Sequence, residues 1–450
     1  MAAVTLALTC TLAGSVRLSG AERQGRVLRV ALVGDPQVDN PVEMGYARQS
    51  IYRDLRGRRD LDLCFFLGDL VNDNMSLLPE SLNIIDSLPF QSFMVPGNHD
   101  RDVYHGSKSS GSMSRPRDLS TWRKSVGYVD TSFVRGNVRF IMMNNVRHAA
   151  AGMTDYVGGF TEKQKHWLDS VLVTDVTRGR KMSRGSVARS RRPSLGKVTP
   201  ALTILATHIP FSQMKGRDSV LALIPEQARM LYVSGHTHFI SRDNSIPEVI
   251  AGATCGSWWR GVKDSDGVPY ALQSCGAPRG YFVAEIRRDG DYTLRYRCVG
   301  RDDEVSVWGV REEGEIGADR LYINVFGGAP DGVVKVRGAR RWRITSRGDG
   351  VHDGSDTQGL SRKKRDLVCE RSAKTAPEVE QVIEFNASMS RDYRKSHRDE
   401  FIPLRRKPST HLWQTTDFVS GPLPVYVNVV YRDSHMRFRQ RVPLTVVNRH

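Results

Sequence analysis

The sequence lacks the features that would place it in several common classes. Its six cysteines form no C-x-x-C pair and no dense framework, which argues against a zinc ribbon or a disulfide-stabilised scaffold. After the first two dozen residues no stretch reaches the roughly 18 to 20 apolar residues that a bilayer-spanning helix needs, so we expect no transmembrane span. Acidic residues are outnumbered, because 49 Asp and Glu face 66 Lys and Arg and leave a net charge of +17.

That positive charge would attract anionic partners, but its distribution does not favour nucleic acid. The densest basic runs, residues 178–181, 189–192 and 362–365, contain no aromatic residues on which bases could stack. We therefore interpret these runs as solvated loops and do not expect a nucleic-acid partner.

The N-terminus has the composition of a secretory signal. An apolar run from Ala2 to Gly14 is followed by the small residues Ser15, Ser19 and Gly20. This pattern predicts a signal peptide over residues 1–24 and export to the periplasm or the extracellular space. No Lys or Arg precedes the run, so a partly buried N-terminal strand in a cytoplasmic protein is the alternative.

The length and the texture of the chain predict two domains. A chain of 450 residues exceeds the size that one hydrophobic core usually supports. Over residues 25–300 short apolar runs such as Leu28 to Val33 alternate with amphipathic stretches such as Tyr46 to Arg58 and Thr161 to Val173, which predicts a layered α/β domain. Residues 301–450 instead show short alternating segments between turn signals, which predicts an all-β domain.

Polar clusters follow five of the apolar runs in the α/β region. Because ligands bind beyond the carboxyl ends of the strands in an open α/β sheet, we expect the clusters to converge. Their carboxylates, imidazoles and side-chain amide suit Mn, Fe, Zn or similar divalent ions. A carboxylate such as Asp69 can bridge two cations. A pair of bridged cations stabilises an in-line displacement at phosphorus and lowers the pKa of the water molecule that they share. The clusters are Gly34 to Gln37, Gly68 to Asp73, Gly97 to Asp100, Thr207 to Pro210 and Gly235 to His238.

In this order the clusters resemble the motifs of the calcineurin-like metallophosphoesterase superfamily, which read D-x-H, GD-x-x-D, GNH[D/E], a lone His and GH-x-H. The resemblance covers about residues 28 to 281, and five ordered motifs are far more specific than any one of them. It implies a four-layer α/β sandwich and two divalent metal ions. The implied metal ligands are Asp35, Gln37, Asp69, Asn98, His208, His236 and His238.

The resemblance also implies a role for each residue. Asp35 and His238 would bind one metal, and Asp69 would bridge the two metals. Asn98, His208 and His236 would complete the second site. His99 would not be a ligand but would stabilise the substrate phosphate or protonate the leaving oxygen, with Asp100 as its partner.

Two positions depart from the superfamily pattern. Gln37 stands where the common pattern has histidine, and its amide oxygen is a weaker ligand for a transition metal. Asn72 stands where many members have aspartate, and Asp73 follows it.

Later residues resemble the extracellular branch of the superfamily that carries a C-terminal β domain. Trp258 and Trp259 either form a wall of the substrate pocket or pack between the domains, and Arg260 beside them is a candidate phosphate contact. The predicted function is hydrolysis of a phosphomonoester or phosphodiester through a dinuclear metal-bound hydroxide. The alternative is a metal-containing binding protein with little turnover, whose β domain docks on a glycan or protein.

Overall fold

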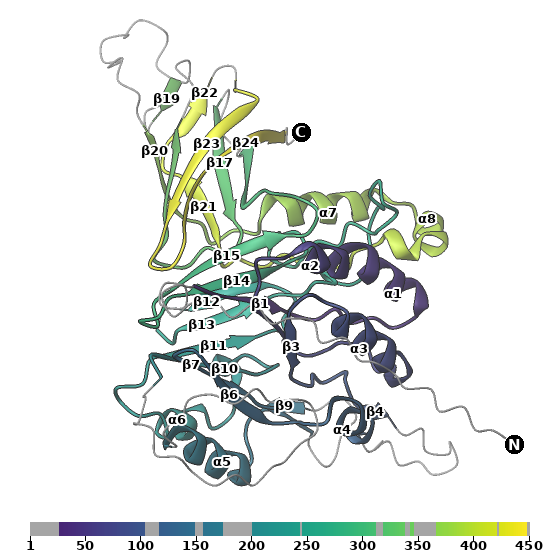
Figure 1. Ribbon diagram of the computed structural model, residues 1–450. Helices are drawn as coiled ribbons and strands as arrows, with labels where there is room; N and C mark the ends of the chain where they lie inside the picture. The colour runs from purple at the N-terminus through teal and green to yellow at the C-terminus, as the bar shows by residue number, and fades with distance from the viewer. Residues whose placement is uncertain are drawn as a thin grey trace, which may run out of the picture.

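The computed structural model describes residues 27–103, 117–148, 156–173, 200–243, 245–311, 318–337, 343–345, 366–420 and 423–447. The predicted signal peptide lies outside these residues. The described chain forms an α/β sandwich followed by a β-barrel (Figure 1). None of the helices in these ranges combines the length and the apolar character that crossing a membrane requires.

The first sheet of the sandwich has five strands in the order β15-β14-β1-β2-β3. The strands β1, β2 and β3 run parallel, and β14 returns antiparallel beside β1. The bounds are β1 (Leu28–Val33), β2 (Leu63–Phe66), β3 (Gln91–Met94), β14 (Gly280–Ile286) and β15 (Tyr292–Cys298).

The second sheet has six strands in the order β12-β13-β11-β10-β7-β6. Its four central strands are parallel, whereas the edge strands β6 and β12 are antiparallel to their neighbours. The bounds are β6 (Thr131–Arg135), β7 (Val138–Met142), β10 (Leu202–Ala206), β11 (Met230–Ser234), β12 (Ile240–Asp243) and β13 (Glu248–Ala251).

The two sheets pack face to face, and helices cover both outer faces. Alternate residues of each strand face the shared core, for example Leu32, Phe65 and Phe140, while Val33 and Phe66 face the helices beyond the first sheet. The predicted four-layer sandwich is therefore confirmed. The helices are α1 (Pro41–Ala47), α2 (Arg53–Gly57), α3 (Leu78–Asp86) and α4 (Ser120–Val126) on one face, and α5 (Glu162–Val173) and α6 (Arg217–Leu221) on the other.

Two helical predictions can be compared with the structure directly. The predicted helix from Tyr46 to Arg58 forms as α1 and α2 joined by a π-helical stretch over Arg48–Tyr52. The helix α5 has a capping box, since the Gln164 backbone N–H donates to Thr161 Oγ1 over 3.3 Å and the Thr161 N–H donates to Gln164 Oε1 over 3.0 Å. Two short ribbons, β4 (Asp102–Val103) with β5 (Arg117–Asp118) and β8 (Val146–His148) with β9 (Tyr156–Gly158), lie beside the sandwich.

The C-terminal β prediction is confirmed as a closed barrel. Seven strands follow one another around it in the order β16-β24-β23-β18-β20-β21-β17, and the pairing of β17 with β16 closes the ring. β22 (Phe418–Ser420) and β19 (Arg343–Thr345) extend one side. The barrel strands are β16 (Val305–Val310), β17 (Ala318–Val325), β18 (Val333–Arg337), β20 (Asp366–Arg371), β21 (Leu412–Thr415), β23 (Tyr426–Arg432) and β24 (Arg437–Val447).

Two helices lie between β20 and β21 that the sequence did not predict. They are α7 (Pro377–Ser388) and α8 (Arg391–Ser396). Val379 of α7 packs against Leu272 of the sandwich. The helix α7 lies where the barrel meets the sandwich, so it helps to attach the two (Figure 1).

Candidate metal centre

The predicted ligands come together where five parallel strands end. Asp35 follows β1, Asp69 follows β2 and Asn98 follows β3, all in the first sheet. His208 follows β10 and His236 follows β11, in the second sheet. Because the two sheets pack face to face, these loops meet at one edge of the sandwich, as the strand pattern predicts.

The backbone is strained at this edge. Six described residues other than glycine have φ between 37° and 72°, a left-handed conformation that L-residues rarely adopt. All six lie at the candidate centre. Each costs roughly 1 to 3 kcal/mol, and strain of this kind persists where a functional geometry requires it. The residues are Asp35, Gln37, Asp69, Asp73, His236 and His238.

Two glycines let the acidic ligands approach their neighbours closely. A Cβ on Gly97 would lie 2.0 Å from Asp69 Oδ1, and a Cβ on Gly235 would lie 2.6 Å from Asp35 Oδ1. Any side chain at either position would displace a carboxylate, so the glycines of the GNH and GHTH motifs are needed for packing at the site itself.

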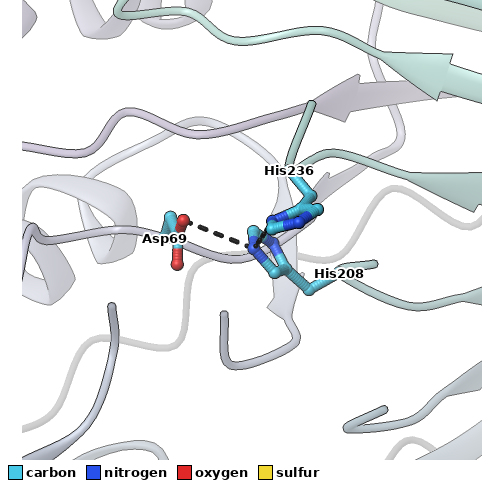
Figure 2. A group of neighbouring side chains, drawn as sticks. All are labelled: Asp69, His208 and His236. Carbon is cyan, nitrogen blue, oxygen red and sulfur yellow. Dashed lines mark hydrogen bonds and ion pairs between the residues drawn. The ribbon is translucent and has the colours of Figure 1, made fainter. Parts of the chain in front are cut away.

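The best-formed part of the centre surrounds one ring nitrogen of His208 (Figure 2). His208 Nδ1 lies 2.8 Å from the Leu67 carbonyl oxygen, which assigns the proton to Nδ1 and directs Nε2 into the site. Nε2 lies 2.9 Å from Asn98 Oδ1, 3.3 Å from Asp69 Oδ2 and 3.1 Å from His236 Nδ1. In the neutral tautomer four lone-pair donors thus face one another, an arrangement that a cation stabilises, either a proton on Nε2 or a metal ion in its place.

A second cluster lies around the Asp35 carboxylate. Asp35 Oδ2 accepts the backbone N–H of His236 over 2.7 Å and lies 3.9 Å from His238 Nε2. Asp35 Oδ1 is fully buried and has no hydrogen-bond partner. The nearest positively charged group is His208, whose Nδ1 lies 3.7 Å away, beyond hydrogen-bond range. A buried carboxylate oxygen that accepts no hydrogen bond is costly, so this oxygen also fits a metal ion.

Gln37 lies in the same cluster, and the nitrogen of its side-chain amide is hydrogen-bonded. Its Nε2 donates to Asn72 Oδ1 over 3.3 Å, which leaves Oε1 as the atom available to a cation. Cys255 Sγ lies 3.8 Å from Gln37 Oε1 and 3.8 Å from His238 Nδ1. Sequence reasoning missed this thiol, because Cys255 belongs to no motif and reaches the site only where its backbone N–H donates to the Asp35 carbonyl oxygen.

The structure places a different carboxylate beside His99 than the predicted Asp100. Both oxygens of Asp100 accept backbone N–H groups, Oδ1 from Val71 over 3.1 Å and Oδ2 from Gly97 over 2.9 Å. His99 Nδ1 instead lies 3.2 Å from Asp73 Oδ2. Asp100 therefore connects the loops of the second and third motifs. Asp73, the residue after Asn72, is the carboxylate that lies beside His99.

The charges of the centre are strongly coupled. Burial opposes protonation of His208, but Asp69 and Asp35 raise its pKa to about 9. Burial and the adjacent His208 lower the pKa of His236 to about 3. Burial also lowers the pKa of His238, which leaves that imidazole neutral and able to bind a metal.

The pKa values of His99 and Asp100, which are not predicted metal ligands, are also shifted. Burial opposes protonation of His99, but its contact with Asp73 raises its pKa overall. Burial and the nearby Asp69 carboxylate raise the pKa of Asp100 to about 7. His208 and Asp100 are fully buried, whereas the His99 side chain is 25% exposed, so among the groups with a raised pKa His99 is the one that solvent or a substrate can reach.

Aromatic rings flank the histidines of the GHTH motif. The Trp258 ring lies 5.4 Å from the His238 ring and is half-buried, so it lines the site. Trp259 is buried and donates from Nε1 to the Pro36 carbonyl oxygen over 2.8 Å, so it packs in the core. Arg260 is exposed beside them. Sequence reasoning did not single out Tyr156, whose ring lies 5.6 Å from that of His236.

The fold and the site define a metal-dependent hydrolase built on an α/β sandwich. The chain belongs to the calcineurin-like phosphoesterase family, which it matches over residues 28–239, and residues 248–386 match the C-terminal domain of calcineurin-like phosphoesterases. It is therefore a hydrolase that acts on phosphoric esters and uses divalent metal.

Other comparisons add little to this assignment. No curated protein matches the chain. Among solved structures it is similar to the NAD nucleotidase NadN of Haemophilus influenzae, at 11% identity and a TM-score of 0.29. The match covers 61% of this chain and only 50% of that one.

Proposed function

We propose that the chain hydrolyses a phosphomonoester or phosphodiester with two divalent metal ions of the Mn, Fe or Zn kind. The observation that carries the proposal is the group of buried Asp69 and His208 and half-buried His236, whose ligand atoms lie within 4.8 Å of one another. Asp69 belongs to this group, and its charge also acts on Asp35 and His238 of the second cluster, which supports a bridging role.

The residues divide into two ligand sets. Asn98, His208 and His236 would hold the second ion, and Asp35, Gln37 and His238 would hold the first. Bound divalent ions neutralise charge on the phosphate and make a water molecule nucleophilic near neutral pH. The second set contains two imidazoles, whereas the first offers one imidazole and the weaker amide of Gln37, so we expect the first ion to be released more easily.

His99 acts on the substrate and not on the metals. Its side chain is 25% exposed, so it can reach a bound ester, and Asp73 favours its protonated form. In that form it donates a hydrogen bond to a phosphate oxygen and passes its proton to the leaving oxygen. Asp73 fixes the orientation of the ring through Nδ1, which leaves Nε2 for the substrate.

The test combines metal content with turnover. The full chain is stripped with a chelator and reloaded with Mn, Fe or Zn, and bound metal and the hydrolysis of aryl phosphates and aryl diesters are measured across several pH values. We expect up to two ions per chain and activity that depends on them. Less than one ion per chain, or no hydrolysis with any metal, would contradict the proposal.

One substitution separates an enzyme from a metal-containing binding protein. The His99→Ala variant should keep its metals, but its turnover should fall by a factor of about 10² to 10⁴, the usual contribution of a general acid. The matched control is His397→Ala, because His397 is an exposed histidine directly after α8 and outside the centre. Equal turnover of His99→Ala and the wild type would favour the binding protein.

A further inference from the structure

A large groove lies between the sandwich and the barrel. It has a volume of about 1030 Å³ and is lined by β15 and the end of β14 on one side and by the β23–β24 hairpin on the other (Figure 1). None of the seven candidate metal ligands lines this junction groove. The groove is thus separate from the metal centre.

Arginine dominates the junction groove. Eight arginines line it against six acidic residues. Five of those six carboxylates already pair with an arginine, among them Glu304 with Arg295 and Asp433 with Arg242. The five arginines on the sandwich wall also have acidic partners, for example Arg297 with Asp54. Most of the negative charge around the groove is therefore already paired with arginine.

The hairpin wall carries positive charge without such partners. Arg432, Arg437 and Arg439 are exposed, and no acidic side chain of the described chain pairs with them. Arg432 and Arg437 stand directly opposite each other in the β23–β24 register, and like charges in that relation destabilise a sheet. Arg439 lies two residues beyond Arg437 and shares its face. A bound anion would relieve the repulsion within this group.

We propose that the junction groove binds a linear oligoanion that carries two or more phosphate or sulfate groups in a row. Guanidinium groups bind tetrahedral oxyanions through paired hydrogen bonds. Arg437 and Arg439 are separated by about 7 Å along the strand, a span for several charged groups in series. The volume is at the upper end of the roughly 300 to 1,000 Å³ of small-molecule sites, which also suits an extended ligand.

The lining favours an oligoanion over a nucleic acid. Apart from His435, its aromatic rings are those of Tyr296, which is fully buried, and Phe438, which stacks on Tyr431. Neither is free to stack on a base, so the groove recognises charge and not bases. This inference does not rest on the proposed phosphoesterase activity.

The test measures binding to the metal-free full chain, so that the metal centre does not contribute. The chelator is removed by gel filtration, and tripolyphosphate, a trisulfated heparin disaccharide and orthophosphate are titrated by calorimetry. We expect at least one of the two oligoanions to bind about tenfold tighter than orthophosphate, and the comparison of the two identifies phosphate or sulfate as the preferred group. Equal binding of all three anions would overturn the proposal.

A pair of variants locates the site. Arg437→Gln should weaken oligoanion binding about tenfold or more, as expected for the loss of one charge-assisted contact. Arg391→Gln, an exposed arginine of α8 outside the groove, should leave it unchanged. Equal affinity of Arg437→Gln and the wild type would overturn the proposal.

The same variant also tests whether the arginine has a structural role. Without ligand, Arg437→Gln should unfold at the same or a higher urea concentration than the wild type, because it removes the like-charge contact with Arg432. A lower midpoint would identify Arg437 as a structural residue and would also overturn the proposal.

Discussion

Gln37 and Asn72, the two residues that depart from the superfamily pattern, contact each other. Gln37 Nε2 donates to Asn72 Oδ1, so the two changes form one amide pair at the edge of the first metal position. An imidazole beside a carboxylate at these positions would carry charge, whereas the amide pair is neutral. The departure is therefore a single paired change, and in the proposed dinuclear centre it would give the first metal position weaker ligands than the second.

The acid of the second motif stands one position later than in the superfamily pattern, at Asp73. The structure shows how Asp73 nevertheless comes close to His99. Asp73 has φ of 57°, and this left-handed turn brings its carboxylate to His99 Nδ1. No local signal in the sequence predicts such a turn at an aspartate. The family resemblance implied Asp100 as the partner, but both of its carboxylate oxygens accept backbone N–H groups of the motif loops.

Substitution of the two acids should separate catalysis from folding. Asp73→Asn should lower turnover about 10- to 100-fold without changing the urea midpoint, because it removes the charge that favours protonated His99. Asp100→Ala should lower the free energy of unfolding by about 1 to 3 kcal/mol for each of the two backbone donors it leaves unpaired. Turnover and urea unfolding of both variants measure this. A stability loss confined to Asp73→Asn would contradict the assignment.

Among the elements, the turn between β23 and β24 joins the barrel to the sandwich through a buried ion pair. Asp433 and Arg242 form an ion pair whose side chains are 0% and 2% exposed. Asp433 also accepts the Tyr431 hydroxyl over 2.7 Å and the backbone N–H groups of His435 and Met436 over 2.6 Å each. His435 stacks on Tyr292, and its carbonyl oxygen accepts the Leu294 N–H of β15 over 2.9 Å.

Removal of that carboxylate should therefore be far more harmful than removal of a surface one. Asp433→Ala should lower the free energy of unfolding by about 3 to 5 kcal/mol, because it leaves Arg242 buried without its partner. The matched control is Asp366→Ala, which breaks the partly exposed pair with Arg337 and should cost about 0 to 1 kcal/mol. Urea unfolding of both variants measures the difference, and equal losses would show that the junction pair has no special role.

The sequence was informative about elements whose signals are local. Buried strands such as β1 and β10 appear as continuous apolar runs, and the capping box at Thr161 marks the start of α5. The helices α7 and α8 also have local start signals, Pro377 at the first position of α7 and the N-cap Ser390 of α8, which sequence reasoning overlooked. The π-helical stretch at Arg48–Tyr52 has no side-chain cap. The approach of Cys255 to Gln37 depends on contacts between segments 218 residues apart, which no periodicity reports.

At the scale of the whole molecule, the interface between sandwich and barrel is held by buried polar contacts as well as by apolar packing. Ser409 Oγ donates to the Cys275 carbonyl oxygen over 3.1 Å, and Thr410 Oγ1 donates to that of Ile240 over 2.6 Å. His411 follows directly and is fully buried, with no hydrogen-bond partner for either ring nitrogen. The histidine is therefore neutral in the folded chain.

That buried histidine makes the stability of the molecule sensitive to acid. Burial and the nearby Arg371 lower the pKa of His411 from 6.5 to about 3. Between these values the unfolded chain binds a proton that the folded chain does not, so stability is complete above pH 6.5 and falls as the pH decreases. The loss approaches about 1.4 kcal/mol for each pH unit below 6.5.

Comparison with a variant isolates this single group from all the others that titrate. His411→Leu cannot bind the proton, so its free energy of unfolding should decrease less than that of the wild type between pH 7.5 and pH 5. The control is His397→Leu at the exposed position directly after α8, which should follow the wild type. Urea unfolding at each pH gives the three curves. A constant difference between wild type and His411→Leu at every pH would mean that the histidine is already charged, or solvated, in the folded molecule.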